Sequence, residues 1–190
     1  MAAAAVLAGG ASRRMGRDKA TMPVEGVELA ATVLAAAARV AAPVVLVAPE
    51  GHAARRLASR VVTDPGQGPL AALAAALEAL DGTEVLVLAG DHPGLRVELL
   101  AHLVALAPRG EAVACRRGSR LEPLVAVYRR VPALAAATRA LPGGSLLGLL
   151  ADLQTVVVEE PEWRALDPDG RSFVDLDDPG DVAAWQAGRR

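Results

Sequence analysis

Short apolar runs without alternating polar residues recur along the first half of this chain, separated by segments rich in alanine and leucine. Strands that are apolar at every position are typical of a parallel sheet covered on both faces. The runs predict strands at 3–8, 43–48, 60–63 and 84–90. The helical periodicity between and after them predicts helices at 28–41, 52–59, 69–80 and 96–107. This order predicts an α/β fold, a doubly wound and mostly parallel sheet with helices on both faces.

The second half of the chain is less regular. Its apolar runs predict strands at 111–116, 122–129 and 154–160, and its helical segments lie at 132–141 and 146–152. The stretch 172–186 predicts a short strand, a turn and a helix that begins near Pro179. No linker or repeat interrupts the 190 residues, so we expect a single domain over 1–190.

The charge and the amino-acid composition of the chain limit which classes of partner it can bind. The net charge is −2 and aromatic residues make up 2% of the chain, which argues against nucleic acid as a partner because a basic field and stacking side chains are lacking. The apolar N-terminal stretch is too short to span a bilayer, so no membrane association is expected. With one cysteine, Cys115, no disulfide forms within the chain, which fits a cytoplasmic protein.

The stretch "VLAGGASRRMGRDKA" at 6–20 begins in the first predicted strand and combines glycines with a cluster of positively charged side chains. Gly9 and Gly10 let backbone N–H groups approach an anion, and Ser12 adds a hydroxyl donor. The cations are Arg13, Arg14, Arg17 and Lys19. The stretch is not a Walker loop, because Ala20 follows the lysine, and its glycines miss the dinucleotide spacing. The alternative is a glycine turn before a solvated basic surface.

The same residues resemble the signature of the molybdenum cofactor guanylyltransferases, a family of nucleotidyltransferases with a doubly wound core. The family pattern Leu-Ala-Gly-Gly-x-Ser-x-Arg-Met-Gly-x-Asp-Lys is met at every specified position from Leu7 to Lys19. Three weaker blocks follow in family order, "TDPGQGPLAAL" at 63–73, "LAGDHPGL" at 88–95 and "FVDLDDPGDVAAWQ" at 173–186. Together the blocks cover most of the chain.

The resemblance implies transfer of GMP from Mg-GTP to the phosphate of molybdopterin, with release of pyrophosphate. It also implies Mg²⁺ as cofactor and, beyond the two substrates, molybdoenzymes or cofactor-chaperone proteins as partners. By position in the motifs, the implied catalytic residues are Lys19, Arg14 and Asp91. The implied nucleotide contacts are Leu7, Ala8, Gly9, Gly10, Ser12, Lys19, Asp64 and Asp91.

Asp91 is also predicted from the residues themselves. It directly follows the buried run 84–90, and ligands of doubly wound sheets bind beyond the carboxyl ends of the strands. Mg²⁺ prefers one or two carboxylates together with phosphate oxygens and water. The alternative is an ordinary turn aspartate before "HPG".

Asp175 and Asp177 alternate along "VDLD", so we expect them on one face of a short strand. The family often carries asparagines in this block, and the change to aspartate either adds Asp177 as a second metal ligand beside Asp91 or alters contact with the pterin. Both residues are therefore candidate acceptor contacts. The alternative is a strand edge that leads into a helix capped by Asp178.

The choice of nucleotide depends on single residues that differ between branches of the family. The cytidylyl branch of the family usually has alanine at the position of Gly9, so the glycine favours guanine, since a methyl group would crowd the purine. After the second predicted strand, Val47 and Ala48 stand where the family often has a polar nucleotide contact. A cytidylyltransferase, another small-molecule nucleotidyltransferase, or a GTP- or cofactor-binding module without turnover remain alternatives. The candidates for the acceptor phosphate are Arg120, Arg129 and Arg130.

Overall fold

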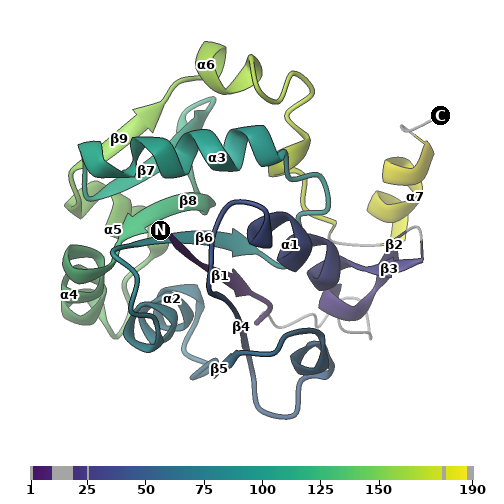
Figure 1. The fold of residues 1–190 in the computed structure, drawn as a ribbon, viewed down its shortest axis with the longest axis horizontal. Helices are drawn as coiled ribbons and strands as arrows, with labels where there is room; N and C mark the ends of the chain where they lie inside the picture. The colour runs from purple at the N-terminus through teal and green to yellow at the C-terminus, as the bar shows by residue number, and fades with distance from the viewer. Residues whose placement is uncertain (1, 10–18, 25, 177–178, 188–190) are drawn as a thin grey trace.

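The computed structural model describes residues 2–9, 19–24, 26–176 and 179–187. Within these ranges, seven strands form one sheet in the order β5-β4-β1-β6-β8-β7-β9, and β2 and β3 pair separately (Figure 1). The strands of the sheet are β1 Ala3–Leu7, β4 Val44–Ala48, β5 Val61–Thr63, β6 Glu84–Ala89, β7 Ala112–Arg117, β8 Arg120–Arg129 and β9 Thr155–Val158. The separate pair is β2 Pro23–Val24 and β3 Val27–Glu28.

The sheet is mostly parallel, as predicted. Strand β1 pairs in parallel with β4 and β6, β4 pairs in parallel with β5, and β7 pairs in parallel with β9. Strand β8 runs antiparallel to both of its neighbours. The central strand β1 is buried along its whole length, which explains why its sequence lacks polar alternation.

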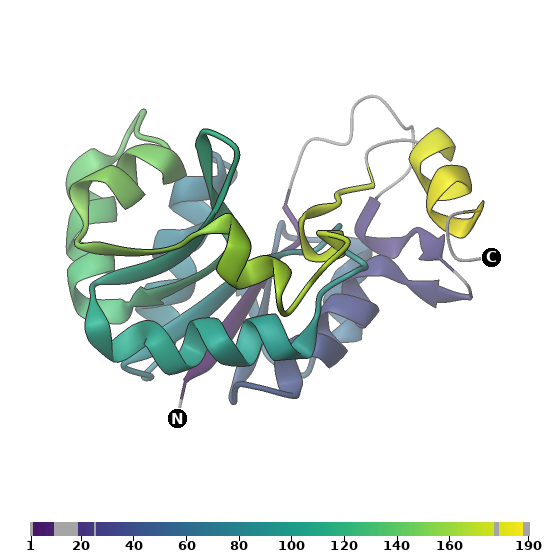
Figure 2. The same ribbon diagram turned by 90° about the horizontal axis from the view of Figure 1, so that it is seen from above.

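Helices cover both faces of the sheet (Figure 2). They are α1 Leu29–Ala38, α2 Pro69–Ala79, α3 Val97–Leu106, α4 Arg130–Ala140, α5 Leu146–Asp152, α6 Glu160–Arg164 and α7 Pro179–Ala187. Short 3-10 turns are η1 Lys19–Thr21, η2 Ala53–Leu57, η3 Ala107–Arg109 and η4 Arg171–Phe173. No helix in the described ranges combines the length and the apolar character needed to cross a bilayer.

Alternation along β1 divides the core into two layers. Ala4 and Val6 pack with α1 and α3, whereas Ala5 and Leu7 pack with α2, α4 and α5. Successive side chains of a strand point to opposite faces, so one strand supplies both layers. A third cluster joins Val24, Leu29, Leu176 and Trp185, and it holds α7 against the β2–β3 pair (Figure 1).

Three local predictions need correction, and two short strands were not predicted. The segment 52–59 forms the 3-10 turn η2 instead of a regular helix, and β2 and β3 are too short for their periodicity to reveal them. The strand expected at 154–160 ends at Val158, because α6 begins at Glu160 with a proline in its first turn. The strand expected within 172–178 is absent from its described part, where η4 is followed by irregular chain over 174–176.

Candidate active site

The loops that follow β1, β5 and β6 meet at one edge of the sheet. The Ala8 N–H donates to the Val47 carbonyl at 2.8 Å, and the Gly90 N–H donates to the Leu7 carbonyl at 2.9 Å. The Asp64 N–H donates to the Ala48 carbonyl at 3.0 Å, which extends the sheet by one residue beyond β5. These bonds bring the backbone of the first glycine motif, the loop of Asp64 and the loop of Asp91 together, as the carboxyl-edge rule predicts.

Gly9 is packed directly against Asp64. A Cβ placed on Gly9 would overlap the Oδ2 atom of Asp64, so only glycine permits this approach. The other carboxylate oxygen of Asp64 accepts a hydrogen bond of 2.8 Å from the Gly66 N–H, which closes a tight turn. A methyl group on Gly9 would therefore meet the Asp64 carboxylate, a contact that the sequence did not reveal.

Asp91 occupies the turn that follows β6, and its side chain is 29% exposed. The Nε2 atom of His92 lies 3.9 Å from its Oδ1 atom, and His92 itself is buried. The Asp91 carbonyl accepts a hydrogen bond of 3.2 Å from the Leu176 N–H. This loop is thus tied to the C-terminal segment through backbone, while the carboxylate reaches the surface of the sheet edge.

The residues of this edge fit a magnesium ion that is shared with a substrate. Mg²⁺ typically takes one or two carboxylates from the protein and the rest of its shell from phosphate oxygens and water. Asp91 supplies a partly exposed carboxylate of this kind. In the described part of the chain, no group of three or more His, Cys, Asp or Glu side chains forms a complete protein site for a metal. One partly exposed carboxylate fits the share of a Mg²⁺ shell that a protein supplies when phosphate oxygens and water complete it.

Several predicted site residues cannot be placed beside Asp91. Gly10, Ser12, Arg14 and Asp177 lie outside the described residues, as does Asp178. Lys19 is described in its backbone, at the start of η1, and the following residue Ala20 is buried in the core cluster of α1 and α3. The shared magnesium site of Asp91 and Asp177 stays a prediction.

Asp175 does not lie on a strand, so the expected strand face shared with Asp177 is wrong at this residue. The period-two pattern of "VDLD" misled the prediction, because the chain here follows contacts with other loops. Gly170 adopts a left-handed conformation with φ +65° and leads into η4, which ends at Phe173. Asp175 is exposed in the irregular chain that follows.

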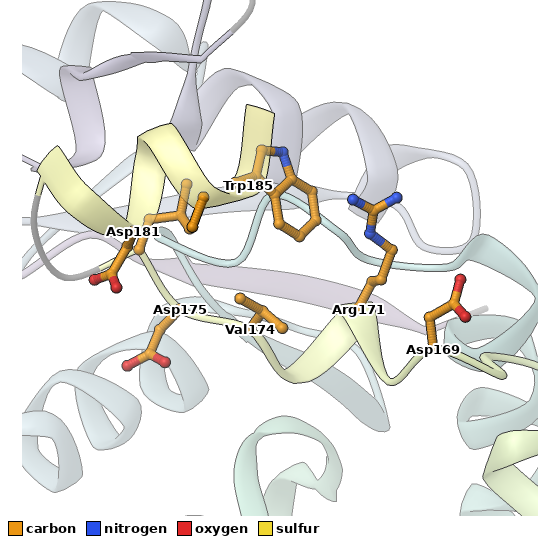
Figure 3. A pocket seen from close by; sticks show the side chains of 8 residues that line it. Asp169, Arg171, Val174, Asp175, Asp181 and Trp185 are labelled. Atoms are coloured by element: carbon orange, nitrogen blue, oxygen red, sulfur yellow. The ribbon is translucent and has the colours of Figure 1, made fainter. Parts of the chain in front are cut away.

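A pocket of about 480 Å³ lies between this irregular segment and α7 (Figure 3). It is lined by Asp169, Arg171, Val174, Asp175, Leu176, Asp181, Ala184 and Trp185. The guanidinium of Arg171 lies over the indole ring of Trp185, 4.3 Å from its centroid. Figure 3 shows Asp175 and Asp181 coming from the two walls of the pocket. Its lining holds three carboxylates and one guanidinium, so the pocket favours ligand groups that donate hydrogen bonds.

Sequence analysis named one residue of this pocket, Asp175, but not the pocket itself, which forms where the chain around η4 folds against α7. A further signal was Trp185, one of two tryptophans in a chain with very few aromatic residues.

The arginines proposed for the acceptor phosphate are separated by the antiparallel course of β8. Arg120 pairs with Arg117 at the carboxyl end of β7, on the side of the site. Arg129 pairs with Glu84 at the start of β6, and Arg130 follows it. Arg129 and Arg130 therefore lie at the opposite edge of the sheet, and their proposed role is wrong.

Cys115 is buried in β7, in the core beneath α3, as expected for a small core residue. Burial, followed by the nearby carboxylate of Glu122, raises the pKa of its thiol to about 12. The thiol is therefore protonated at neutral pH and unsuited to nucleophilic chemistry.

Comparison with known proteins gives a consistent result. The model of the MobA-like NTP transferase domain matches residues 4–164. A probable molybdenum cofactor guanylyltransferase of Chloroflexus aggregans is 32% identical over 192 aligned residues, covering 96% of this chain and 92% of the relative. The probable molybdenum cofactor guanylyltransferase of Opitutus terrae is 36% identical over 180 residues, covering 85% of this chain and 87% of the relative.

Among solved structures, molybdopterin-guanine dinucleotide biosynthesis protein A from Archaeoglobus fulgidus superposes with a TM-score of 0.83 at 26% identity. The match covers 99% of this chain and 100% of that structure. The sheet order, the convergence of the glycine motif with the loops of Asp64 and Asp91, and these similarities agree with one another. The chain belongs to the family of MobA-like NTP transferase domains and is a nucleotidyltransferase.

Proposed function

We propose that this protein transfers GMP from Mg-GTP to the phosphate of molybdopterin and releases pyrophosphate. The observation that carries the proposal is the convergence of Gly9, Asp64 and Asp91 on one sheet edge, in a chain that is similar to named guanylyltransferases over most of its length. The edge offers backbone donors and carboxylates on one side and a pocket for a second ligand beyond Asp91.

The reaction is an in-line displacement at the α-phosphorus of GTP. An oxygen of the acceptor phosphate forms the new P–O bond, the bond to the bridging oxygen of pyrophosphate breaks, and both electrons of that bond leave with pyrophosphate. The acceptor phosphate is already ionised near pH 7, so no strong general base is needed. Catalysis then depends on positioning and on stabilisation of charge.

The residues divide this work between them. Backbone N–H groups of the Leu7–Gly10 motif and the hydroxyl of Ser12 are proposed to hold the nucleotide, with Asp64 beside Gly9. Lys19 and Arg14 are proposed to balance the charge that develops on the phosphates. Asp91 would hold Mg²⁺ together with phosphate oxygens, and the ion when bound neutralises their charge and fixes their geometry.

The acceptor is proposed to lie on the far side of Asp91. Asp175 lines the pocket next to α7, in the segment whose Leu176 N–H is bonded to the Asp91 carbonyl. A pterin ring carries amino and ring N–H donors, which suit a pocket rich in carboxylates. Asp177 is proposed to assist Asp175 in this contact. We further propose a cytoplasmic setting and transfer of the product to molybdoenzymes or cofactor-chaperone proteins.

A nucleotide panel tests the function directly. The purified protein is incubated with Mg²⁺, molybdopterin and GTP, CTP or ATP in turn, and pyrophosphate release is measured with and without the acceptor. We expect acceptor-dependent release with GTP well ahead of CTP and ATP. A preference for CTP would assign the cytidylyl reaction instead, and GTP binding without release would indicate a binding module.

A further inference from the structure

Asp167 is a fully buried carboxylate that the proposed mechanism does not use. It lies between α6 and η4 and accepts two backbone hydrogen bonds. The Arg171 N–H donates to its Oδ1 atom at 3.1 Å, and the Ser172 N–H donates to its Oδ2 atom at 2.7 Å. A buried carboxylate is costly unless its oxygens are hydrogen-bonded, so these contacts define what Asp167 does in the fold.

The carboxylate is also linked to the loop that carries Asp91. The Nε atom of Arg96 lies 3.7 Å from Asp167 Oδ1. Arg96 stands immediately before α3, five residues after Asp91 in the chain, and its N–H donates to the Oγ atom of the buried Ser172 at 2.9 Å. Asp167 and Ser172 therefore fasten the start of η4 to the C-terminal end of the Asp91 loop.

Two further contacts complete the attachment. At the other end of the segment, the Leu176 N–H donates to the Asp91 carbonyl at 3.2 Å. In its middle, the Arg117 guanidinium donates to the Phe173 carbonyl at 2.9 Å. The segment 171–176 is thus held at both ends by the loop 91–96, and four of its residues, Arg171, Val174, Asp175 and Leu176, line the pocket next to α7.

We infer that Asp167 is a positioning residue, which sets the acceptor side of the active site relative to Asp91. The inference rests on the proposed function, because it takes the pocket beside Asp175 as the acceptor side. Asp167 does not touch either substrate in this scheme. It acts through the two N–H groups that orient η4, and through η4 on Asp175 and on the wall of the pocket formed by Arg171.

Asp167→Asn tests the inference at nearly constant volume. An amide has one acceptor oxygen, and its NH₂ group would face a backbone N–H, so one of the two bonds is lost. We expect the KM for molybdopterin to rise about 10- to 100-fold, the range found when a residue that orients a metal ligand through a hydrogen bond is replaced. The affinity for GTP, measured by equilibrium binding with Mg²⁺, should stay within about twofold of the wild type.

Glu111→Gln is the matched control. The Glu111 carboxylate also accepts a backbone hydrogen bond, of 3.0 Å from the Gln154 N–H, but it lies beside the start of β7, at the opposite edge of the sheet. The Gln side chain keeps an oxygen that can accept this single bond, so the variant should change neither the stability nor the acceptor KM selectively. If Asp167→Asn behaved like this control, or if it weakened GTP and acceptor binding equally, Asp167 would be an ordinary structural residue.

Ser172→Ala and hydrogen exchange make the test independent of folding losses and of turnover. Ser172→Ala removes the acceptor of the Arg96 N–H and should also raise the acceptor KM selectively, even if Asp167→Asn fails to fold. Amide exchange should speed up over 91–96 and 171–176 in these variants and not in Glu111→Gln. Unchanged exchange there would overturn the inference. A wild-type protein without turnover would refute the proposed function alone, because exchange still reports whether Asp167 joins the two segments.

Discussion

At the scale of single residues, Gly9 and Asp64 depend on one another. The glycine was expected to leave room for a purine, but its missing Cβ is the space into which the Asp64 carboxylate fits. Any effect of Gly9 on nucleotide choice therefore passes through the position of that carboxylate. The other carboxylate oxygen, Oδ1, accepts the Gly66 N–H that closes the turn, so one hydrogen bond holds the carboxylate in this position.

Gly9→Ala should lower kcat/KM for GTP relative to CTP, because the added methyl group displaces Asp64 from its place beside the nucleotide motif. A pocket contact of this size is worth about 1–3 kcal/mol of discrimination, or roughly 10- to 200-fold. Steady-state kinetics with both nucleotides measure the ratio. In the Asp64→Ala background the same substitution should cost much less, and an equal cost in both backgrounds would show that the methyl group acts elsewhere.

Asp91→Ala should abolish magnesium-dependent turnover while the protein stays folded, because the side chain is partly exposed at the edge of the sheet and the backbone bond to Leu176 is kept. Magnesium titrations of pyrophosphate release, together with a thermal melt, measure both effects. Asp91→Asn should be milder than the alanine variant, since an amide oxygen still coordinates a hard cation. Full activity in Asp91→Ala would remove this residue from the mechanism.

At the scale of elements, the loop 91–96, the turn η4 and helix α7 meet at Gly94. A Cβ on this glycine would overlap the Arg171 carbonyl oxygen and lie 2.6 Å from Cη2 of Trp185. The glycine in "HPGL" is therefore explained by close packing of three segments. Gly94 in the Asp91 loop thus packs against two residues that line the pocket, Arg171 and Trp185.

Gly94→Ala should force η4 and α7 away from the Asp91 loop. Overpacking against backbone costs about 1–3 kcal/mol of stability, and the acceptor KM should rise more than the KM for GTP. Denaturant melts and separate kinetics for the two substrates test this expectation. Gly148→Ala in α5 is the control, because its Cβ meets Ser145 Oγ at 3.3 Å and alanine favours a helix. Equal effects of the two variants would contradict the proposed junction.

At the scale of the whole molecule, two apolar layers enclose the sheet, and Cys115 lies in one of them. Its raised pKa has a defined consequence for stability. The thiol of the unfolded chain loses its proton near its ordinary pKa of 9.0, whereas the folded chain keeps the proton until about 12. This residue therefore stabilises the fold fully below pH 9, and its contribution declines as the pH rises from 9 toward 12.

Cys115 should consequently report global unfolding. We expect a thiol reagent at pH 8 to label the protein only as denaturant unfolds it, with a midpoint that coincides with loss of the circular dichroism signal. Mg-GTP should move both midpoints to higher denaturant concentration, because it binds the folded state. At 100 times its Kd it adds about 2.7 kcal/mol to the free energy of unfolding. Labelling well before the loss of helical signal would show that β7 opens locally.

Much of the architecture follows from local sequence. Strands such as 3–8 and 84–90 are apolar throughout because both faces of a parallel strand are covered, and that pattern is visible without a structure. The carboxyl-edge rule predicted Asp91 at the ligand-binding edge, and the family resemblance added Asp64; both residues and Gly9 follow strands of the same parallel set, which explains why they lie near one another. The roles of Arg14, Ser12 and Lys19 remain predictions of the motif alone.

What only the tertiary structure decided concerns residues whose partners are distant in sequence. The alternating "VDLD" predicted a strand around Asp175, but Asp167, Arg96 and Asp91 bind this stretch by hydrogen bonds and hold it as a turn and irregular chain. Arg120 and Arg129 have the same local setting, and the direction of β8 alone puts them at opposite edges. Local sequence encodes periodicity and burial, whereas the close approach at Gly9 and the burial of Asp167 arise only when separate loops share one volume.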